Sequence, residues 1–458
     1  MHAALGRAIE HGSAALSPAW SDVQIGAYPR GFSAWLAVVA AAVGYGPASI
    51  VVSGLGFGLY YFGLRAFLDR GLALPYPGLI AAFLALGSRT PQSFYGWGGA
   101  PTAMALGFGL LAAGELAGAL DSDERRILQR VAAALVAGWL LVGGLWTHPI
   151  GACLGGLLCG VGLILRGRRS PLLAAGLGGV ALLPVAPTML WLRAHGPALS
   201  AHELAWITDF QLQSDNALGS WPAFMAPLTV WWAILHKVGP IVLIAFVLAA
   251  YREWRTPEGR RRVLGSLAAI ELLSLFVAYG HRLPAIGFLI YPSRSMPLAV
   301  PALALPIAHA LHAGQVPRKL LAGLGRVAAL SALIYHVVLY QRALPIATAD
   351  DVRAIACLER KLPADAVVDG AYGDATQWLP ALTGHLVTHP HIHCSLFDEV
   401  ERKIAARTPS YRFVGERLRY GAPLDAPQPS GDPVCEAGGA RLYRLESARD
   451  SETLSQTP

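Results

Sequence analysis

Five acidic residues lie in segments that we expect on the outer side of a membrane, and their carboxylates are the candidates for acid–base chemistry. They are Glu10, Asp22, Glu203, Asp209 and Asp215. Asp22 lies just before the segment where the chain enters its apolar part, so its carboxylate can act as general base toward a hydroxyl presented at the membrane surface. Each of the five can equally be a solvated loop acid or a helix cap. We predict Asp22 or Glu10 as the catalytic base, with Glu203 and Asp209 as substrate contacts.

Basic and aromatic side chains near the same segments are candidates for binding a phosphate and a sugar ring. Arg89 precedes a glycine-rich loop that contains Tyr95 and Trp97. Aromatic faces stack on rings, and glycine lets a backbone approach closely; the alternative is an aromatic belt at the membrane interface. Arg282 and Arg294 bracket a short loop, and two guanidinium groups can hold a phosphate or pyrophosphate. The alternative for this pair is anchoring to lipid headgroups.

Two ionisable residues fall inside apolar segments, where charge is costly and therefore points to function. Lys237 precedes the basic residue Arg252 by about 15 residues, which corresponds to roughly 22 Å along a helix. We expect it to contact a lipid phosphate. Glu271 lies nearer the middle of its segment, so we expect no direct pair between the two. His148, in the sequence Trp-Thr-His-Pro between two apolar runs, is a binding candidate whose simpler interpretation is a turn residue.

Three histidines at alternate positions form the one arrangement that resembles a metal site. His389, His391 and His393 would share a face of a β-strand. The intervening Pro390 favours a plain polar strand or loop instead. We predict no metal centre and no certain cofactor, and we keep a divalent metal at these histidines as the alternative.

The elements that position these residues follow from an apolar composition. The chain has 458 residues, of which 54% are hydrophobic and 14% charged, and its mean hydropathy is +0.46. This charge is too low for soluble domains of such a size. A mainly α, polytopic transmembrane bundle of about ten spans is therefore expected. The spans are predicted near 46–68, 74–88, 98–118, 131–147, 150–166, 171–193, 227–250, 263–281, 295–312 and 320–341. The shorter apolar run 31–44 is either a re-entrant or interfacial helix, or half of one long span.

Charge divides the chain into a basic part and an acidic part. The first 345 residues carry 24 Lys and Arg against 13 acids, whereas residues 346–458 carry 12 against 16. The basic isoelectric point therefore describes a membrane protein with basic loops and an acidic appendix, and it argues against a nucleic-acid partner. We predict an extracytoplasmic amino-terminal loop over 1–30, a transmembrane domain over 31–342, a small extracytoplasmic α/β domain over 343–446 and a disordered tail over 447–458.

Arginine and lysine in alternate loops set the expected orientation in the cytoplasmic membrane. One set of loops is rich in them: Arg65, Arg70, Arg125, Arg126, Arg130, Arg166, Arg168, Arg169, Arg252, Arg255, Arg260, Arg261, Arg262, Arg318 and Lys319. These loops are expected inside, which places both termini outside. An outer amino terminus without a signal peptide indicates either a reverse-anchored first span or a missing span before Met1. Residues 2–12 look like an uncapped amphipathic helix and favour the second explanation.

The carboxyl-terminal region shows local signals of an α/β domain. Thr348-Ala-Asp350-Asp351 resembles a capping box, which predicts a helix through Leu362. Strands are expected at 366–370, within 386–397 and at 441–445. Of the five cysteines, Cys153 and Cys159 lie in an apolar run as small packing residues, and the pairing of Cys357, Cys394 and Cys435 stays open.

The combined pattern resembles the GT-C superfamily of integral-membrane glycosyltransferases. The segments that carry the resemblance cover most of the chain, although each is weak alone: the amphipathic Ala3–Gly12 run, Tyr28–Phe32, Tyr95–Pro101, Trp146–Pro149, Tyr291–Arg294 and Asp374–Gly384. The resemblance implies a polyprenyl-phosphate sugar as donor, a glycan, lipid or protein as acceptor, contact with membrane lipids, and a catalytic acid in the first outer loop. In this superfamily the key aspartate commonly follows the first membrane helix, so here Glu10 or Asp22 would substitute for it.

Two other interpretations of the sequence stay open. A transporter or flippase for a lipid or glycan would also need many spans and buried charge. A truncated, inactive relative would bind a glycan without turning it over.

Overall fold

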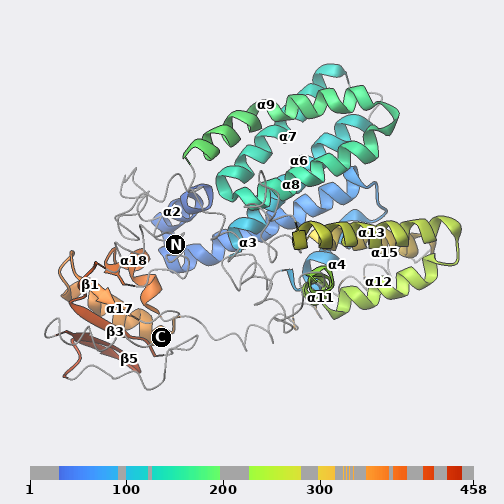
Figure 1. Cartoon of the computed structure of the whole chain (residues 1–458). Coiled ribbons are helices and arrows are strands. Elements are labelled where there is room, and N and C mark those ends of the chain that lie inside the picture. Colours follow the sequence, from blue (N-terminus) through green and yellow to red (C-terminus); the bar gives the residue numbers. More distant parts are fainter. Residues whose placement is uncertain are drawn as a thin grey trace. The chain divides into compact units, whose positions relative to one another are not determined.

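The computed structural model describes residues 30–90, 99–121, 126–195, 226–279, 298–314, 347–370, 375–388, 406–416 and 431–445, with four isolated helical residues between 323 and 334. The chain divides into two compact units. One comprises residues 53–194 and 200–340 and is helical. The other comprises residues 1–52, 195–199 and 341–458 and contains a small α/β domain (Figure 1).

Apolar helices make up the first unit. They are α3 (Tyr45–Ala66), which begins in the other unit and continues into the π-helical turn η1 (Phe67–Gly71), α4 (Pro77–Gly87), α6 (Ala100–Asp121), α7 (Ile127–Thr147), α8 (Pro149–Arg166), α9 (Pro171–His195), α11 (Ala226–Val238), α12 (Pro240–Glu253), α13 (Pro257–Tyr279) and α15 (Ala299–Ala313). Within the described ranges, five helices are long and apolar enough to cross a membrane: α3 with η1, α6, α7, α8 and α9. A sixth is reached if α11 and α12 count as one span.

The predicted fold class is therefore confirmed at a coarse level, as a mainly helical chain with several potential membrane spans and a small carboxyl-terminal sheet. The predicted number of about ten spans is not reached among the described residues. Helices α4 and α15 have 11 and 15 residues, which is short for a span. The predicted span 320–341 lies almost wholly outside the described residues. The predicted span 227–250 corresponds to α11 and α12, which are bent by 99° at Gly239.

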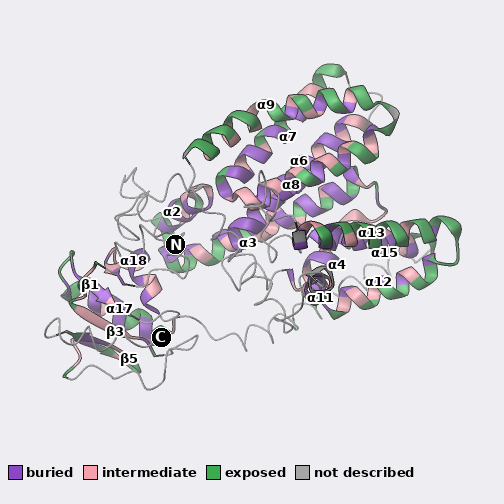
Figure 2. Cartoon of the chain, in the orientation of Figure 1, coloured by how far each residue is buried: buried purple, intermediate pink, exposed green. Residues whose placement is uncertain are grey.

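Glycine allows helix α6 to lie close to its neighbours at the centre of the unit. A Cβ atom added to Gly155 of α8 would overlap the Cα atom of Gly109 in α6. On the other side of α6, a Cβ atom on Gly107 would lie 2.7 Å from the backbone nitrogen of Tyr60 in α3. Between apolar helices such small residues let backbones approach and gain van der Waals contact. Most of α6 is consequently buried (Figure 2).

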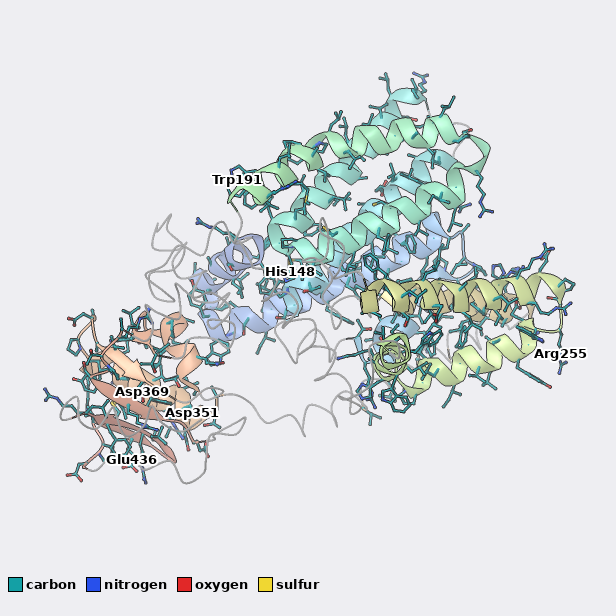
Figure 3. The ribbon with its side chains drawn as sticks, in the orientation of Figure 1. His148, Trp191, Arg255, Asp351, Asp369 and Glu436 are labelled. Atoms are coloured by element: carbon teal, nitrogen blue, oxygen red, sulfur yellow. A yellow bond between two sulfur atoms is a disulfide. The ribbon has the colours of Figure 1, made fainter. Side chains whose placement is uncertain are left out.

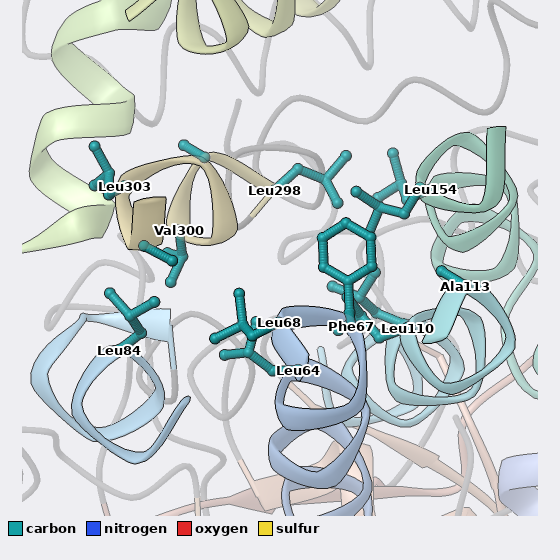
Figure 4. Packing of buried hydrophobic residues seen from close by; sticks show 14 of the residues in the cluster. Leu64, Phe67, Leu68, Leu84, Leu110, Ala113, Leu154, Leu298, Val300 and Leu303 are labelled. Carbon is teal, nitrogen blue, oxygen red and sulfur yellow. The ribbon is translucent and has the colours of Figure 1, made fainter. Parts of the chain in front are cut away.

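Large apolar side chains fill the space between α6 and the remaining helices. The Phe67 ring of η1 lies beside Leu110 of α6 and Leu154 of α8, and Leu298 at the start of α15 faces the same cluster (Figure 4). Other apolar side chains point outward, as Leu172 of α9 does with 89% of its surface exposed. A soluble surface would rarely carry so many exposed apolar residues, whereas lipid would cover them.

Several predicted basic loops meet at one end of the helical unit, which we call the basic end. Arg166 donates from Nε to the Gly71 carbonyl at 3.1 Å and from Nη2 to the Arg70 carbonyl at 3.2 Å, so the end of α8 holds the end of η1. The Arg70 side chain pairs with Glu115 of α6. The predicted alternation of loops therefore holds for these helices, while the assignment of the basic end to the cytoplasm stays a prediction.

The turn between α12 and α13 adds a second ion-pair group to the basic end. Glu253, whose side chain is 6% exposed, pairs with Arg262 at 2.7 Å, and Arg262 also contacts Glu258 at 3.1 Å. His309 of α15 lies within electrostatic reach of Arg262 and Glu253. Arg70 and Arg262 thus neutralise carboxylates at this end, and Arg166 binds backbone carbonyls.

The short apolar run near the start of the chain forms a separate helix, α2 (Gly31–Val43). Gly44 follows it with φ +79°, a left-handed conformation that glycine adopts without strain, and α3 begins at Tyr45. Residues 31–66 are therefore two helices and not one continuous helix. The predicted amino-terminal loop and amphipathic helix over 1–30 lie outside the described residues, except for Arg30.

The carboxyl-terminal region forms a five-stranded sheet, as part of the predicted α/β domain. Its elements are α17 (Ala349–Lys361), β1 (Val367–Asp369), η7 (Ala375–Trp378), α18 (Leu379–Leu382), β2 (Leu386–Val387), β3 (Tyr411–Val414), β4 (Cys435–Ala437) and β5 (Ala440–Arg444). The strand order is β2-β1-β3-β5-β4. Strand β1 is parallel to β2 and to β3, and β5 is antiparallel to β3 and β4.

Local signals predicted part of this domain correctly. Thr348 caps α17 in a capping box with Asp351, and strands lie at three of the predicted places, β1, β2 and β5. Buried Asp351 also accepts a hydrogen bond from the Glu416 backbone nitrogen at 2.8 Å, which ties α17 to the end of β3. A disulfide joins Cys357 of α17 to Cys435 of β4.

Candidate functional site at a helix break

The candidate site begins where α4 ends. Ser88 follows α4 with extended backbone angles (φ −85°, ψ 165°), so the helix stops and the chain turns at Arg89. The Arg89 backbone nitrogen donates to the carbonyl oxygen of Lys237 at 2.9 Å. Thr90 donates from its backbone to the Ser88 hydroxyl at 3.3 Å, and both of these side chains are buried. These bonds fix the backbone on both sides of Arg89.

A sharp break between α11 and α12 supplies the other half of the site. The two helices meet at Gly239 with a bend of 99°. Gly239 has φ +80°, and a Cβ atom at this position would lie 3.3 Å from Cγ of Arg89 and 3.5 Å from its backbone nitrogen. Both the backbone conformation and the close approach therefore require glycine here. Pro240 then starts α12 at the N1 position, where its missing N–H costs nothing.

Helix α11 presents an apolar face to the bundle and a mixed face outward. Val230, Ala233, Ile234 and Val238 are buried at helical spacing. The outward face includes Trp232, and the Trp231 indole nitrogen donates to the Glu271 carboxylate of α13. Glu271 therefore anchors α11, which gives this buried-segment carboxylate a structural role.

Three basic residues meet at the break. The Arg89 guanidinium contacts Nε2 of His236, and Lys237 follows His236 directly at the end of α11. His236 is exposed, whereas Arg89 and Lys237 are half-buried. The amino terminus of α12 begins three residues after Lys237 and carries the positive end of a helix dipole. A guanidinium, an ammonium and a helix amino terminus are the groups that proteins use to bind phosphate.

Sequence reasoning selected Arg89 and Lys237 but missed His236 and the break. The structure brings Arg89 and Lys237 together although 148 positions separate them in the chain. The signal for the break is the Gly239-Pro240 dipeptide, since Gly-Pro marks a turn even within an apolar run. A break predicted at Gly239 would have placed His236 and Lys237 together at the end of one helix, as one basic group.

The third described candidate, His148, lies in a different turn. It joins α7 to α8, is half-buried, and donates its backbone N–H to the Gly144 carbonyl at 2.7 Å, while its own carbonyl accepts from Ala152 at 3.2 Å. Trp146, two residues earlier, packs on Trp191 of α9 with ring centroids 5.2 Å apart. His148 and Trp191 are labelled in Figure 3. This local geometry is that of a turn residue between two helices.

The other predicted site residues lie outside the described part of the chain. They are Glu10, Asp22, Tyr95, Trp97, Glu203, Asp209, Arg282, Arg294, His389, His391 and His393. Within the part that is described, no group of three His, Cys, Asp or Glu side chains could hold a metal ion.

Fold and site together define a class: a helical protein with several helices able to span a membrane, a basic group at a helix break, and a small disulfide-linked α/β domain. No family model matches the chain, and no curated protein matches it.

Proposed function

We propose that this protein is a membrane glycosyltransferase that moves a sugar from a polyprenyl-phosphate carrier to an acceptor on the outer face of the cytoplasmic membrane. The observation that carries the proposal is the meeting of Arg89, His236 and Lys237 at the break between α11 and α12. Two of these residues were selected from the sequence as lipid-phosphate contacts, each for a separate reason. Their proximity supports one phosphate site.

The chemistry of the transfer assigns a role to this basic group. The acceptor oxygen forms a bond to the sugar C1 atom, the bond between C1 and the carrier phosphate oxygen breaks, and the acceptor proton goes to a carboxylate. Negative charge grows on the leaving phosphate, so Arg89 and Lys237 would stabilise the transition state more than the ground state. Asp22 or Glu10 is the proposed base, and the acceptor is a glycan, a lipid or a protein.

The disulfide supports the proposed orientation. A disulfide persists in an oxidising compartment and is rare in the cytosol, so the link between Cys357 and Cys435 favours an extracytoplasmic carboxyl-terminal domain. The arginine-rich loops of the basic end favour the same orientation from an independent feature, because positive charge is retained on the cytoplasmic side. Both features support an integral protein of the cytoplasmic membrane.

A transfer assay tests the proposed function. Membranes that contain the full chain are incubated with a panel of radiolabelled polyprenyl-phosphate sugars, and release of sugar from the carrier is measured against membranes without the chain. We expect release from at least one donor, a lower kcat and kcat/KM in Arg89→Gln, and unchanged kinetics in Arg255→Gln. Absence of release from every donor would contradict the proposal. Full activity in an Asp22→Ala, Glu10→Ala double variant would exclude these two residues as the base.

A transporter or flippase for a lipid or glycan is the second candidate, and the break at Gly239 is the observation that favours it. Transporters bind anionic substrates at discontinuous helices whose half-helix amino termini point at the charge. Reconstituted vesicles separate the two candidates. A flippase would move a fluorescent polyprenyl-phosphate sugar between leaflets without breaking the sugar–phosphate bond, whereas the proposed transferase would release the sugar and leave the leaflet distribution unchanged.

A further inference from the structure

The two faces of the carboxyl-terminal sheet differ in chemistry. One face carries Val368, Val387, Phe413, Leu442 and Cys435, all buried in a single cluster with residues of α17 and α18. The opposite face carries a polar row, because residues paired across neighbouring strands share a face. The row runs from Thr388, beside the end of β2, through Asp369 of β1 and Arg412 of β3 to Tyr443 of β5.

The polar row lies at the place where parallel sheets bind ligands. From β1 the chain leads to β2, on one side of the β1–β3 pair. From β3 the chain leads to β4 and β5, on the other side of that pair. Adjacent parallel strands whose connections leave in opposite directions open a crevice at their carboxyl ends. Asp369 is the last residue of β1, and Arg412 is its partner in β3. The topology therefore places Asp369 at this switch point, with Arg412, the second residue of β3, beside it.

Asp369 and Arg412 leave a hydrogen-bond acceptor and a hydrogen-bond donor close enough for one ligand group to bridge them. The Thr388 hydroxyl donates to Oδ1 of Asp369 at 2.6 Å, which orients the carboxylate. The second oxygen, Oδ2, lies 3.9 Å from Nη1 of Arg412, too far for a hydrogen bond. Nη1 is buried and has no hydrogen-bond partner among the described residues. Buried donors are nearly always satisfied, by protein, water or ligand.

Nη1 of Arg412 is itself buried, so a ligand would reach the pair through the parts of the two side chains that stay exposed. The Arg412 side chain is 14% exposed and that of Asp369 is 23% exposed. A hydroxyl group can donate to Oδ2 of Asp369 and accept from Arg412 at the same time, because it is both donor and acceptor. A phosphate or carboxylate could accept from Arg412 but would meet the negative charge of Asp369. The pair therefore favours a neutral, hydroxylated ligand over an anion.

We propose that Asp369, Arg412 and Thr388 form a saccharide-binding site in the carboxyl-terminal domain, in which one sugar hydroxyl bridges Asp369 and Arg412. The site does not depend on the phosphate group at Arg89, and it would bind sugar whether or not the protein transfers one. The strand pairing places Asp369 and Glu436 on the same face of the sheet. Figure 3 labels both residues in the carboxyl-terminal domain.

Glycan binding by the intact protein tests this site. Full-length protein in detergent is applied to an array of saccharides that includes neutral and acidic glycans, and dissociation constants are then measured for the glycans bound. We expect selective binding of a neutral glycan, with affinity at least 10-fold lower in Asp369→Asn and in Arg412→Gln. Arg441→Gln is the matched control, since Arg441 lies on the same face in an exposed pair with Glu436 at 2.9 Å, and it should retain binding.

Two readouts keep the result interpretable. Protection of Cys357 and Cys435 from alkylation reports that the domain of each variant has folded, and Arg412→Lys, which keeps the charge but changes the geometry of the donors, should bind less tightly than the native protein. Equal glycan affinity in native protein, Asp369→Asn and Arg412→Gln would overturn the proposal. So would the absence of any bound glycan, or a preference for inorganic phosphate over neutral glycans. An unchanged glycan affinity in Arg89→Gln is expected, and its loss would contradict the independence of the two sites.

Discussion

Arginines occupy both ends of the helical unit, but they serve different purposes there. At the basic end Arg70 pairs with Glu115, Arg262 pairs with buried Glu253, and Arg166 binds the backbone carbonyls that end η1. At the other end of α4 and α12, which we call the break end, Arg89 contacts His236 and lies against Lys237.

Ion pairs with carboxylates stabilise the fold at the basic end, whereas the break end is where we propose that a phosphate binds. An arginine that neutralises a carboxylate between helices holds those helices together. Basic side chains and a helix amino terminus are groups that proteins use to bind anions, and we propose that role for the break end. We therefore expect substitutions at the basic end to change stability and substitutions at the break end to change phosphate affinity.

The largest effect is expected from Glu253→Ala at the basic end. Removing Glu253 takes away the buried partner of Arg262 and leaves that arginine only the exposed Glu258, which should cost about 2–3 kcal/mol of unfolding free energy. Denaturation of the detergent-solubilised protein measures this loss, and affinity for polyprenyl phosphate should stay unchanged in the fraction that is folded. Glu258→Ala is the control, because the Glu258 side chain is 80% exposed and its loss should cost under about 0.5 kcal/mol.

Gly239→Ala at the break should affect both properties. An alanine side chain at φ +80° is strained and would press on Arg89, so we expect a loss of about 1–2 kcal/mol in unfolding free energy. The same displacement should weaken phosphate binding. Gly58→Ala in α3 is the control: its added Cβ meets open space, and it should stabilise the protein by about 0.5 kcal/mol. A break that tolerated alanine as well as α3 does would contradict the requirement for glycine.

His236→Gln should lower phosphate affinity by a smaller factor, about threefold, since an exposed imidazole contributes a weaker interaction than a guanidinium. The free energy of unfolding should change by less than about 0.5 kcal/mol. Titration with polyprenyl phosphate measures the first quantity and denaturation the second. A large loss of stability would place His236 among the structural residues.

The smallest effect is expected from Arg255→Gln, at the basic end but outside its ion pairs. Arg255 is exposed at the end of α12, where it lies 5.1 Å from the Tyr251 ring centroid and donates to the Tyr251 hydroxyl at 3.2 Å. Such a surface contact contributes about 0.5 kcal/mol at most. Unchanged phosphate affinity in this variant would show that binding depends on the position of an arginine and not on total charge.

Hydropathy and local motifs predicted the parts of the fold that depend on short stretches of sequence. Apolar runs located the helices, and Thr348 with Asp351 located the start of α17, because a capping box acts within four residues. Strands β3 and β4 were missed although β1 and β2, which are not longer, were predicted, so strand length does not explain the miss. The pairing of Cys357 with Cys435 depends on α17 packing against β4 and could not be derived from spacing.

The site was predictable in its residue types but not in its geometry. Charge in an apolar run singled out Lys237, and a glycine-rich loop singled out Arg89, yet their contact depends on a backbone conformation at Gly239 that hydropathy does not detect. The same limit applies to Asp369 and Arg412, which are 43 positions apart and become neighbours through the parallel pairing of β1 and β3.

The most direct test of the central claim compares the affinity of the purified protein for polyprenyl phosphate and for the uncharged polyprenol of the same length. If Arg89 and Lys237 bind the phosphate, the native protein should prefer the phosphate by at least about 10-fold, equivalent to about 1.4 kcal/mol. An Arg89→Gln, Lys237→Gln double variant should lose that preference while keeping its stability. Equal affinity of the native protein for the two lipids, or an undiminished preference in the double variant, would contradict the account.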